Sequence, residues 1–321
     1  MTAPALIALD WGTTSLRAYL LGDDGTALDT RASSAGIMKL PAGGFDEAFE
    51  ETCGAWLDAH PRLPVIAAGM IGSAQGWIEA PYVDTPADAS ALVAGIVTVT
   101  AARGVTVRVV PGVLERGVLP NVMRGEETQI VGALSADASL SAPGGALIGL
   151  PGTHAKWAFV EDGRIERFYT FMTGETFSAL RDHTILGRTM QQGAAPDAAA
   201  FLRGVDTARD AGHPGLLATI FSTRTLGLTG QLTPEQQPEY LSGLLIGHEL
   251  RGLNEVLARD ASSLAGRTLR LIGNDALCDR YRAALARFGC QDAQTVAHAT
   301  EHGLYRIAAQ AGLVSAPASA A

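Results

Sequence analysis

Apolar and polar positions along this chain of 321 residues follow patterns that predict a mixed α/β fold. Successive strands are expected within residues 5–36, and the GDDG turn at residues 22–25 has the Asp/Gly chemistry of a hairpin. Between residues 45 and 57 the apolar side chains recur every three or four positions, which predicts a helix. A layer of strands covered by helices is therefore expected from the start of the chain.

The next segments continue this pattern. PVIAAGMIGS predicts a buried strand that ends in a glycine-rich loop, and TVRVVPGV predicts another, broken at Pro111. The segment between them, residues 90–104, has an ambiguous period, and we expect a helix there. RGEETQIVGALSAD, residues 124–137, predicts a helix with its acids in the first turn, where the helix dipole favours them.

The pattern restarts after a proline and glycine break at residues 141–145. ALIGLPGTHAKWAFVEDGRIERFYTFM again predicts strand, loop, strand, turn and strand. Most of the remaining chain is expected to be helical, with a last strand-helix unit in TLRLIGNDALCDRYRAALARFG and a final helix from about Glu301. In the apolar helix YLSGLLIGHEL, the glycines favour close helix packing.

Composition narrows the class of protein. With 47% hydrophobic and 18% charged residues, the chain is typical of a soluble globular protein, and its length favours two domains. No apolar run approaches the roughly 20 residues of a membrane span, and the start lacks the basic region of a signal peptide, so a cytoplasmic protein is expected. The net charge of −9 argues against a nucleic-acid partner. Three cysteines without metal-like spacing predict buried free thiols: Cys53, Cys278 and Cys290.

An internal repeat divides the chain. LIALDWGTTSLRAYLLGDDG aligns with ALIGLPGTHAKWAFVEDG, and both copies end in an acidic glycine turn. The repeat predicts two related domains built on the same hairpin. We expect them at residues 1–143 and 144–315, followed by a flexible tail at 316–321. Asp10 has Leu150 opposite it, so the carboxylate occurs in only one copy.

The two bends of this repeat are candidate phosphate sites. A tight glycine turn directs backbone N–H groups to one spot, and hydroxyl groups add donors. The residues are Gly12, Thr13 and Thr14 in the first copy, and Gly152, Thr153 and His154 in the second. His154 is either a phosphate donor or a structural turn residue. Asp10 suits a hydrated Mg²⁺; the alternative is that it caps the turn through the N–H of Thr13 or Thr14.

Several motifs resemble a known family. DWGTTSLR with the later GTH bend resembles the phosphate loops of the actin-like ATPase and sugar kinase superfamily. More closely, MRGEETQ, GTHAKW, AAGMIGSAQGWIEAPYV and MTGETFSALRDHTILG resemble the 2-dehydro-3-deoxygalactonokinase family, and LIGNDALCDRYRAAL is similar to its adenosine loop. The first loop alone indicates only the superfamily. Ser15, Ala155 and Asn274 depart from the pattern that we expect of the family.

The resemblance implies an activity. It is the transfer of the γ-phosphate of ATP, with Mg²⁺, to the 6-hydroxyl of 2-dehydro-3-deoxy-D-galactonate in D-galactonate catabolism. It also implies an α/β fold with two actin-like, ribonuclease H-like domains around a nucleotide and substrate cleft. The alternatives are a kinase for the epimer 2-keto-3-deoxygluconate and a non-kinase actin-like ATPase. Nothing in the sequence determines the oligomeric state, for which a homodimer is one alternative.

MRGEETQ holds the candidate catalytic base, Glu126 or Glu127. Adjacent helical residues point about 100° apart, so we expect one of them to act and prefer Glu126. The alternative is that both simply suit the helix dipole and solvent. Arg124 matches a substrate carboxylate bidentately, with an ion pair to Glu127 as the alternative.

Further candidate binding residues lie in loops and on the adjoining strands. Ser73 and Gln75 are preferred as sugar contacts over Trp77, which could instead be a hydrophobic plug. Arg17 is a further candidate that serves either the strand or the substrate, and Lys156 is either a ligand contact or an exposed strand lysine. We expect the strand-helix junction at Gly273 and Asn274 to bind the adenosine of ATP, with an ordinary turn as the alternative. Glu249 could contact its ribose.

Overall fold

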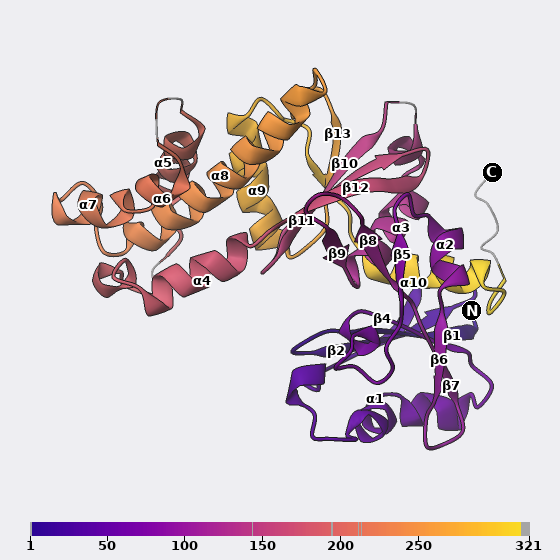
Figure 1. Ribbon diagram of the computed structural model, residues 1–321. Helices are drawn as coiled ribbons and strands as arrows, with labels where there is room; N and C mark the ends of the chain where they lie inside the picture. Colours follow the sequence, from indigo (N-terminus) through magenta and orange to yellow (C-terminus); the bar gives the residue numbers. More distant parts are fainter. Residues whose placement is uncertain (1, 143, 194, 211, 213, 316–321) are drawn as a thin grey trace. The chain divides into compact units, whose positions relative to one another are not determined.

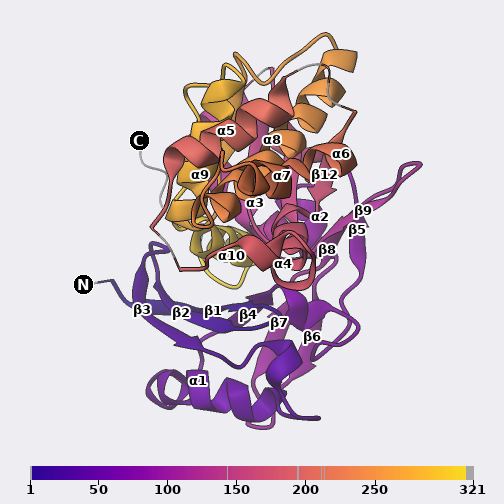
Figure 2. The same ribbon diagram turned by 90° about the vertical axis from the view of Figure 1, so that its left-hand side faces the viewer.

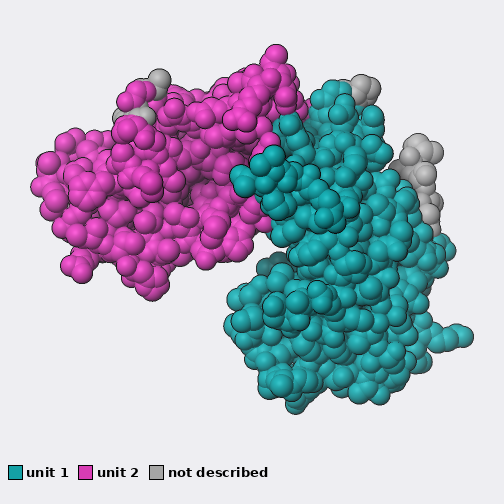
Figure 3. Space-filling model, in the orientation of Figure 1, with its two compact units in different colours: residues 1–146, 158–168, 296–321 teal, residues 147–157, 169–295 magenta. Residues whose placement is uncertain are grey.

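The computed structural model describes residues 2–142, 144–193, 195–210, 212 and 214–315. The chain forms two compact units (Figure 3): residues 1–146, 158–168 and 296–321 make unit 1, and residues 147–157 and 169–295 make unit 2. Residues 296–315 thus group with unit 1. The predicted division at 143/144 stays a prediction, and the predicted tail at 316–321 lies outside the described residues.

Unit 1 is built on a six-stranded sheet with the order β3-β2-β1-β4-β7-β6. Helix α1 (Phe45–Ala59) covers one face, and α10 (Ala299–Gln310) covers the other (Figures 1 and 2). The side chains of Phe49, Cys53 and Trp56 on α1 join the core beneath the sheet. The strands are β1 (Pro4–Trp11), β2 (Leu16–Gly22), β3 (Ala27–Ser33), β4 (Val65–Ala68), β6 (Val97–Thr100) and β7 (Thr106–Val109).

Unit 1 also contains a smaller sheet and two further helices. The sheet consists of β5 (Tyr82–Asp84), β8 (Gly112–Glu115) and β9 (Asn121–Met123), and the helices are α2 (Ala89–Ala94) and α3 (Glu126–Ala136). Helices α3 and α10 cross at glycines, because a Cβ on Gly132 would lie 1.8 Å from the carbonyl oxygen of Ala299.

A second sheet has the order β12-β11-β10-β13-β14. Numbered along its own repeat, this order begins with the third, second, first and fourth strands, as β3-β2-β1-β4 does in unit 1. The predicted α/β fold with two related halves is therefore confirmed. The strands are β10 (Ala146–Leu150), β11 (Ala155–Glu161), β12 (Arg164–Phe171), β13 (Thr268–Leu271) and β14 (Gln294–Thr295).

The helices of unit 2 confirm the predicted close packing. A Cβ on Gly243 of α8 would lie 1.9 Å from the carbonyl oxygen of Phe201 on α5, so only glycine lets these helices approach. The helices are α4 (Thr173–His183), α5 (Ala198–Arg209), α6 (Leu216–Thr219), α7 (Ser222–Leu228), α8 (Gln236–Arg259) and α9 (Asp275–Arg287).

The prediction of a helix over residues 90–104 is wrong for most of that segment. Helix α2 ends at Ala94, and Val97–Thr100 forms β6, which pairs antiparallel with β7. Alternating valine and threonine favour a strand because their β-branched side chains lose less freedom there. The three cysteines are free and buried, as predicted. No helix in the described part of the chain is long and apolar enough to cross a membrane.

Candidate active site

The first bend is held rigidly at the end of β1. The Gly12 N–H donates to the Ser15 carbonyl oxygen at 2.9 Å, and the N–H groups of Ile37 and Met38 donate to the carbonyl oxygens of Gly12 and Thr13 at 3.1 Å. Thr13 and Thr14 are exposed, and no protein partner of their hydroxyls is described. The bend therefore offers free donors on a fixed backbone, as a phosphate cradle needs.

Asp10 precedes this bend and lies beside the start of α3. A Cβ on Gly69, at the end of β4, would lie 3.6 Å from Asp10 Oδ1, and a Cβ on Gly125 would lie 3.3 Å from Gly69 Cα. Both glycines have positive φ, 97° and 110°. Within the described residues Asp10 makes no hydrogen bond to Thr13 or Thr14, so the turn-capping alternative is not observed.

Negative charge concentrates around Asp10. Burial raises the pKa of Asp10; Arg17, its partner on β2, lowers that pKa in part, and the carboxylates of Glu301 and Glu126 raise it further. Glu301, in the first turn of α10, is a neighbour that the sequence patterns did not indicate. Converging carboxylates suit a divalent cation. Among the described residues no group of three or more His, Cys, Asp or Glu forms a ready metal cage, so water and phosphate oxygens would complete the shell around Mg²⁺.

Glu126 and Glu127 have different surroundings. Glu127 is 0% exposed, and both its carboxylate oxygens accept from the Gly125 N–H, at 2.9 and 2.7 Å. Burial raises the pKa of Glu127 to about 7, and the charge of Glu126 adds to the shift. Glu126 is half-buried, and its Oε2 accepts from the Arg124 backbone N–H at 3.0 Å. Of the two, Glu126 is the one that another molecule can reach.

Arg124 carries donors without a protein acceptor. Its Nη2 donates to the Ala80 carbonyl oxygen at 2.9 Å, and its guanidinium lies 4.3 Å from the Tyr82 ring centre. Its Nε and Nη1 are buried and have no hydrogen-bond partner. The Oγ of Ser73 is likewise buried and has none. No salt bridge joins Arg124 to Glu127 within the described residues, so that alternative is not observed. Because buried donors are almost always paired, these atoms indicate a missing acceptor.

The other predicted sugar contacts differ in placement. Gln75 and Arg17 are exposed, on the loop after β4 and on β2. Trp77 stacks on Phe45 at 5.9 Å within the aromatic cluster beneath the sheet, which fits the plug alternative; its contact with substrate stays a prediction. Lys156 is 5% exposed, so its alternative as an exposed strand lysine is wrong.

The second bend borders a cavity of about 520 Å³ in unit 2. Gly152 and Thr153 line it, and the Glu175 N–H donates to the Thr153 carbonyl oxygen at 3.0 Å. The side chain of His154 bonds Glu175. The cavity has mostly apolar walls, and its further lining residues are Pro151, Thr173, Gly174, Phe177, Pro238, Glu239, Ser242, Leu245, Ile246, Asn274, Leu277, Arg280 and Tyr281.

The predicted adenosine junction lies at this cavity. Asn274 lines the wall and caps α9, its Oδ1 accepting from the Ala276 N–H at 3.0 Å. Gly273 precedes it but is not a lining residue. Arg280 and Glu239 form an ion pair at 2.7 Å in the wall, which the sequence reasoning missed because the two residues lie on different helices. A flat apolar ring system with hydroxyl groups suits such walls.

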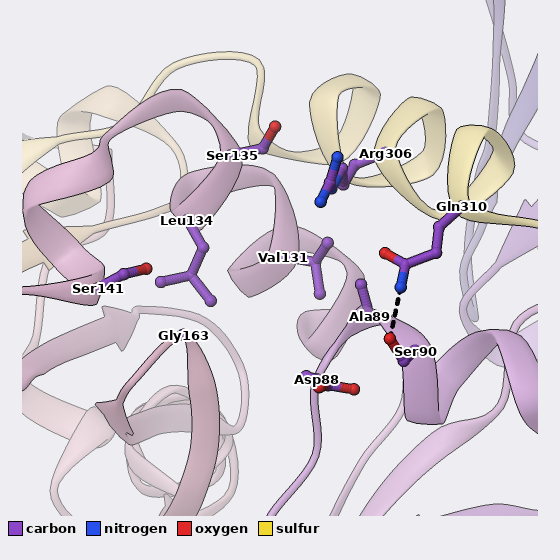
Figure 4. A pocket seen from close by; sticks show the side chains of 10 residues that line it. All are labelled: Asp88, Ala89, Ser90, Val131, Leu134, Ser135, Ser141, Gly163, Arg306 and Gln310. Carbon is purple, nitrogen blue, oxygen red and sulfur yellow. Dashed lines mark hydrogen bonds between the residues drawn. The ribbon is translucent and has the colours of Figure 1, made fainter. Parts of the chain in front are cut away.

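A second cavity, of about 440 Å³, is formed by α2, α3 and α10 in unit 1 (Figure 4). Arg306, Gln310 and three serines line it, together with Asp88, which caps α2. It contains none of the predicted site residues, so it is separate from the candidate site.

Comparisons with known proteins agree with the motifs. The family model described as 2-keto-3-deoxy-galactonokinase matches residues 10–307. A 2-dehydro-3-deoxygalactonokinase of Escherichia coli (strain K12) is 34% identical over 287 residues, 88% of this chain and 90% of that protein. A protein of Rhizobium meliloti (strain 1021), described as a probable 2-dehydro-3-deoxygalactonokinase, is 39% identical over 292 residues, 90% of this chain and 91% of that protein. A crystal structure from Sinorhizobium meliloti, titled for the same activity, has a TM-score of 0.84 at 35% identity and covers 95% of this chain and 98% of its own.

Proposed function

This chain belongs to the 2-keto-3-deoxy-galactonokinase family, and we propose that it transfers the γ-phosphoryl group of ATP to the 6-hydroxyl of 2-dehydro-3-deoxy-D-galactonate. The products are ADP and the 6-phospho sugar acid, and the enzyme is a phosphotransferase with an alcohol acceptor. We place this reaction in the cytoplasm and in D-galactonate catabolism.

One observation carries the substrate class. Arg124 has two buried guanidinium nitrogens without a partner, and Ser73 has a buried hydroxyl without one. A Cβ on Gly72, the neighbour of Ser73 in the chain, would lie 3.0 Å from Arg124 Nη1, so the guanidinium packs against the backbone beside Ser73. A sugar acid brings the acceptors that they lack, a carboxylate for the guanidinium and hydroxyls for Ser73. A neutral sugar would leave Arg124 without its counterion.

The acid-base role in the proposal belongs to Glu126. Phosphoryl transfer to an alcohol is mostly positioning and charge neutralisation, together with a carboxylate that accepts the hydroxyl proton. Glu126 is reachable and follows Arg124 closely in the chain, whereas Glu127 is enclosed and holds the Gly125 N–H at the start of α3. Glu127 is therefore assigned to shaping the helix start.

The phosphates of ATP are assigned to the two bends. Gly12, Thr13 and Thr14 offer backbone and hydroxyl donors, and Gly152, Thr153 and His154 are assigned the same role in the second copy. Asp10 would hold Mg²⁺, which, when bound, neutralises charge on the phosphate oxygens. The nucleoside is assigned to the 520 Å³ cavity, with Asn274 and Gly273 at its strand-helix junction. Gln75, Trp77, Arg17 and Lys156 remain proposed substrate contacts.

Release of ADP from Mg-ATP with each purified keto-deoxy acid tests the function. We expect turnover with 2-dehydro-3-deoxygalactonate and a lower kcat/KM with its gluconate epimer. Mass spectrometry of the product should locate phosphate on the 6-hydroxyl. If neither acid is phosphorylated, the proposed function is wrong; a preference for the gluconate epimer would replace only the substrate.

Replacing Arg124 by methionine should raise the KM for the sugar acid by roughly 10- to 100-fold, because a charge-assisted hydrogen bond contributes about 1.5–3 kcal/mol. The KM for ATP should stay within about twofold. Steady-state kinetics with each substrate varied in turn measures both. Arg116→Met, at an exposed arginine paired with Asp84, is the matched control and should change neither. An unchanged KM for the acid in Arg124→Met would exclude Arg124 from its binding.

A further inference from the structure

Glu249, on α8, is a buried acid that the proposed reaction does not use. It is 3% exposed, and its Oε1 accepts from Trp157 Nε1 at 2.6 Å. Its Oε2 accepts from Tyr281 Oη at 2.8 Å and from Thr173 Oγ1. One carboxylate thus receives three hydrogen bonds from side chains.

These donors come from three separate segments of unit 2, two of which line the 520 Å³ cavity. Trp157 lies on β11, directly after the second bend; Thr173 is the first residue of α4; Tyr281 lies on α9. Thr173 and Tyr281 line the cavity, whereas Glu249 and Trp157 lie behind it. Glu249 therefore joins the segments that enclose the cavity without lining it itself, and the predicted ribose contact is wrong for this side chain.

The start of α4 is also fitted tightly to the second bend. A Cβ on Gly174 would lie 2.5 Å from the Gly152 carbonyl oxygen, and the Glu175 N–H bonds the Thr153 carbonyl oxygen. Any shift of Thr173 away from Glu249 would therefore move the backbone of the bend. The hydrogen bonds of Glu249 and the position of the bend depend on each other.

The chemistry of the donors explains why an acid occupies this position. An indole N–H can only donate, so Trp157 needs an acceptor, and two hydroxyls compete for the same side chain. Only a carboxylate has enough lone pairs to accept all three bonds. A leucine would fill the volume but remove the acceptor of two buried donors, Trp157 and Tyr281, and of the half-buried Thr173 hydroxyl. Burial raises the pKa of Glu249 to about 7, so an acid is an unfavourable choice for packing alone.

We infer that Glu249 is a positioning residue of the nucleotide cavity: it fixes Trp157, Thr173 and Tyr281, and thereby sets the affinity for ATP without touching it. The inference rests on the proposed function, because it takes the cavity to hold the nucleoside of ATP. Removing the Glu249 carboxylate should therefore weaken nucleotide binding and leave the sugar-acid site unchanged.

The test compares Glu249→Leu and Glu249→Gln in the full chain. With leucine we expect the Kd for ADP, measured by calorimetry, and the KM for ATP to rise about tenfold or more. The KM for the sugar acid should stay within about threefold. Glutamine should restore ADP binding to within about threefold, because its oxygen can accept from Trp157 while its NH₂ donates to a hydroxyl. A residue that only stabilises the core would not produce this split.

Glu255→Leu is the matched control, since Glu255 lies on the same helix but is exposed and paired with Arg251. ADP affinity within twofold of wild type in a folded Glu249→Leu variant would overturn the inference. If circular dichroism shows that Glu249→Leu does not fold, Trp157→Phe replaces it as the test, because Trp157 does not line the cavity either. The ADP affinity of Trp157→Phe should fall about threefold. An unchanged ADP affinity would overturn the inference in the same way. Failure of the wild-type chain to bind ADP would instead contradict the proposed function.

Discussion

Replacing Asp10 by asparagine is expected to lower kcat by about a thousandfold while leaving the fold intact. Asparagine keeps the shape but removes the charge that would hold Mg²⁺. A metal ion stabilises the transition state by several kcal/mol, and each 1.36 kcal/mol changes the rate tenfold. The measurement is ADP release at saturating Mg-ATP and sugar acid, with circular dichroism and a thermal melt on the same sample.

The fold should survive because Asp10 contributes little to it. Among the described residues its side chain makes no hydrogen bond, and it lies near the carboxylates of Glu126 and Glu301, which repel it. A neutral amide avoids the cost of burying a charge and relieves that repulsion, while it loses the attraction of Arg17, so the melting temperature should change little. Asp23→Asn, at an exposed position in the β2–β3 turn, is the control and should keep full activity.

A magnesium titration separates the role of Asp10 from other causes of lost activity. Chelation should abolish wild-type turnover, and added Mg²⁺ should restore it. The Asp10→Asn variant should need a much higher Mg²⁺ concentration for its residual rate, because one carboxylate of the shell is missing. Wild-type activity with unaltered magnesium dependence in this variant would remove Asp10 from the site.

Features that depend on neighbouring residues were predictable from the sequence. The hairpin at β1 and β2 follows from alternating apolar positions and a glycine turn, and comparison of the two copies indicated Asp10 as the addition. The pairing of the first two strands in each sheet then follows from the repeat. Helix α3 was predicted because its acids and apolar period occur within one short segment.

Features that depend on residues far apart in the chain were not predictable from the sequence. Glu301 lies near Asp10 although almost the whole chain separates them, and no local pattern reports such a neighbour. The hydrogen bonds of Glu249 join β11, α4, α8 and α9, and the sequence indicated only a possible ribose contact. Lys156 was ambiguous because a single strand does not show whether both faces of its sheet are covered. At β6 the pairing with β7 decided between helix and strand.

The second large effect is expected from Glu126→Gln, which should lower kcat by roughly 10²- to 10⁴-fold, the usual contribution of a general base. The amide keeps the hydrogen bond from the Arg124 N–H but cannot accept a proton. The KM values should change little, because the group acts in the chemical step. Single-turnover measurements of phosphoryl transfer would show whether that step has slowed.

Glu127→Gln is the matched control, because it makes the same change one residue later at an enclosed side chain. Its activity should stay within about tenfold of wild type. Its stability should differ in pH dependence. Burial raises the pKa of Glu127 in the folded state to about 7, above the ordinary glutamate value of 4.5, so the folded state binds more protons between these two pH values. The wild-type free energy of unfolding should therefore fall as pH rises from about 4.5 through 7, and the variant should lose that part of the slope.

The two variants together assign the base. Loss of turnover in Glu126→Gln with retained turnover in Glu127→Gln is the result that the burial of Glu127 predicts. The opposite result would mean that the Glu127 carboxylate becomes accessible when substrate binds, and that its raised pKa serves proton transfer near neutral pH. In that case the wild-type kcat should rise through about pH 7, because only the ionised carboxylate accepts the proton. If both variants keep wild-type turnover, neither glutamate is the base, and proton transfer must use another group near Asp10.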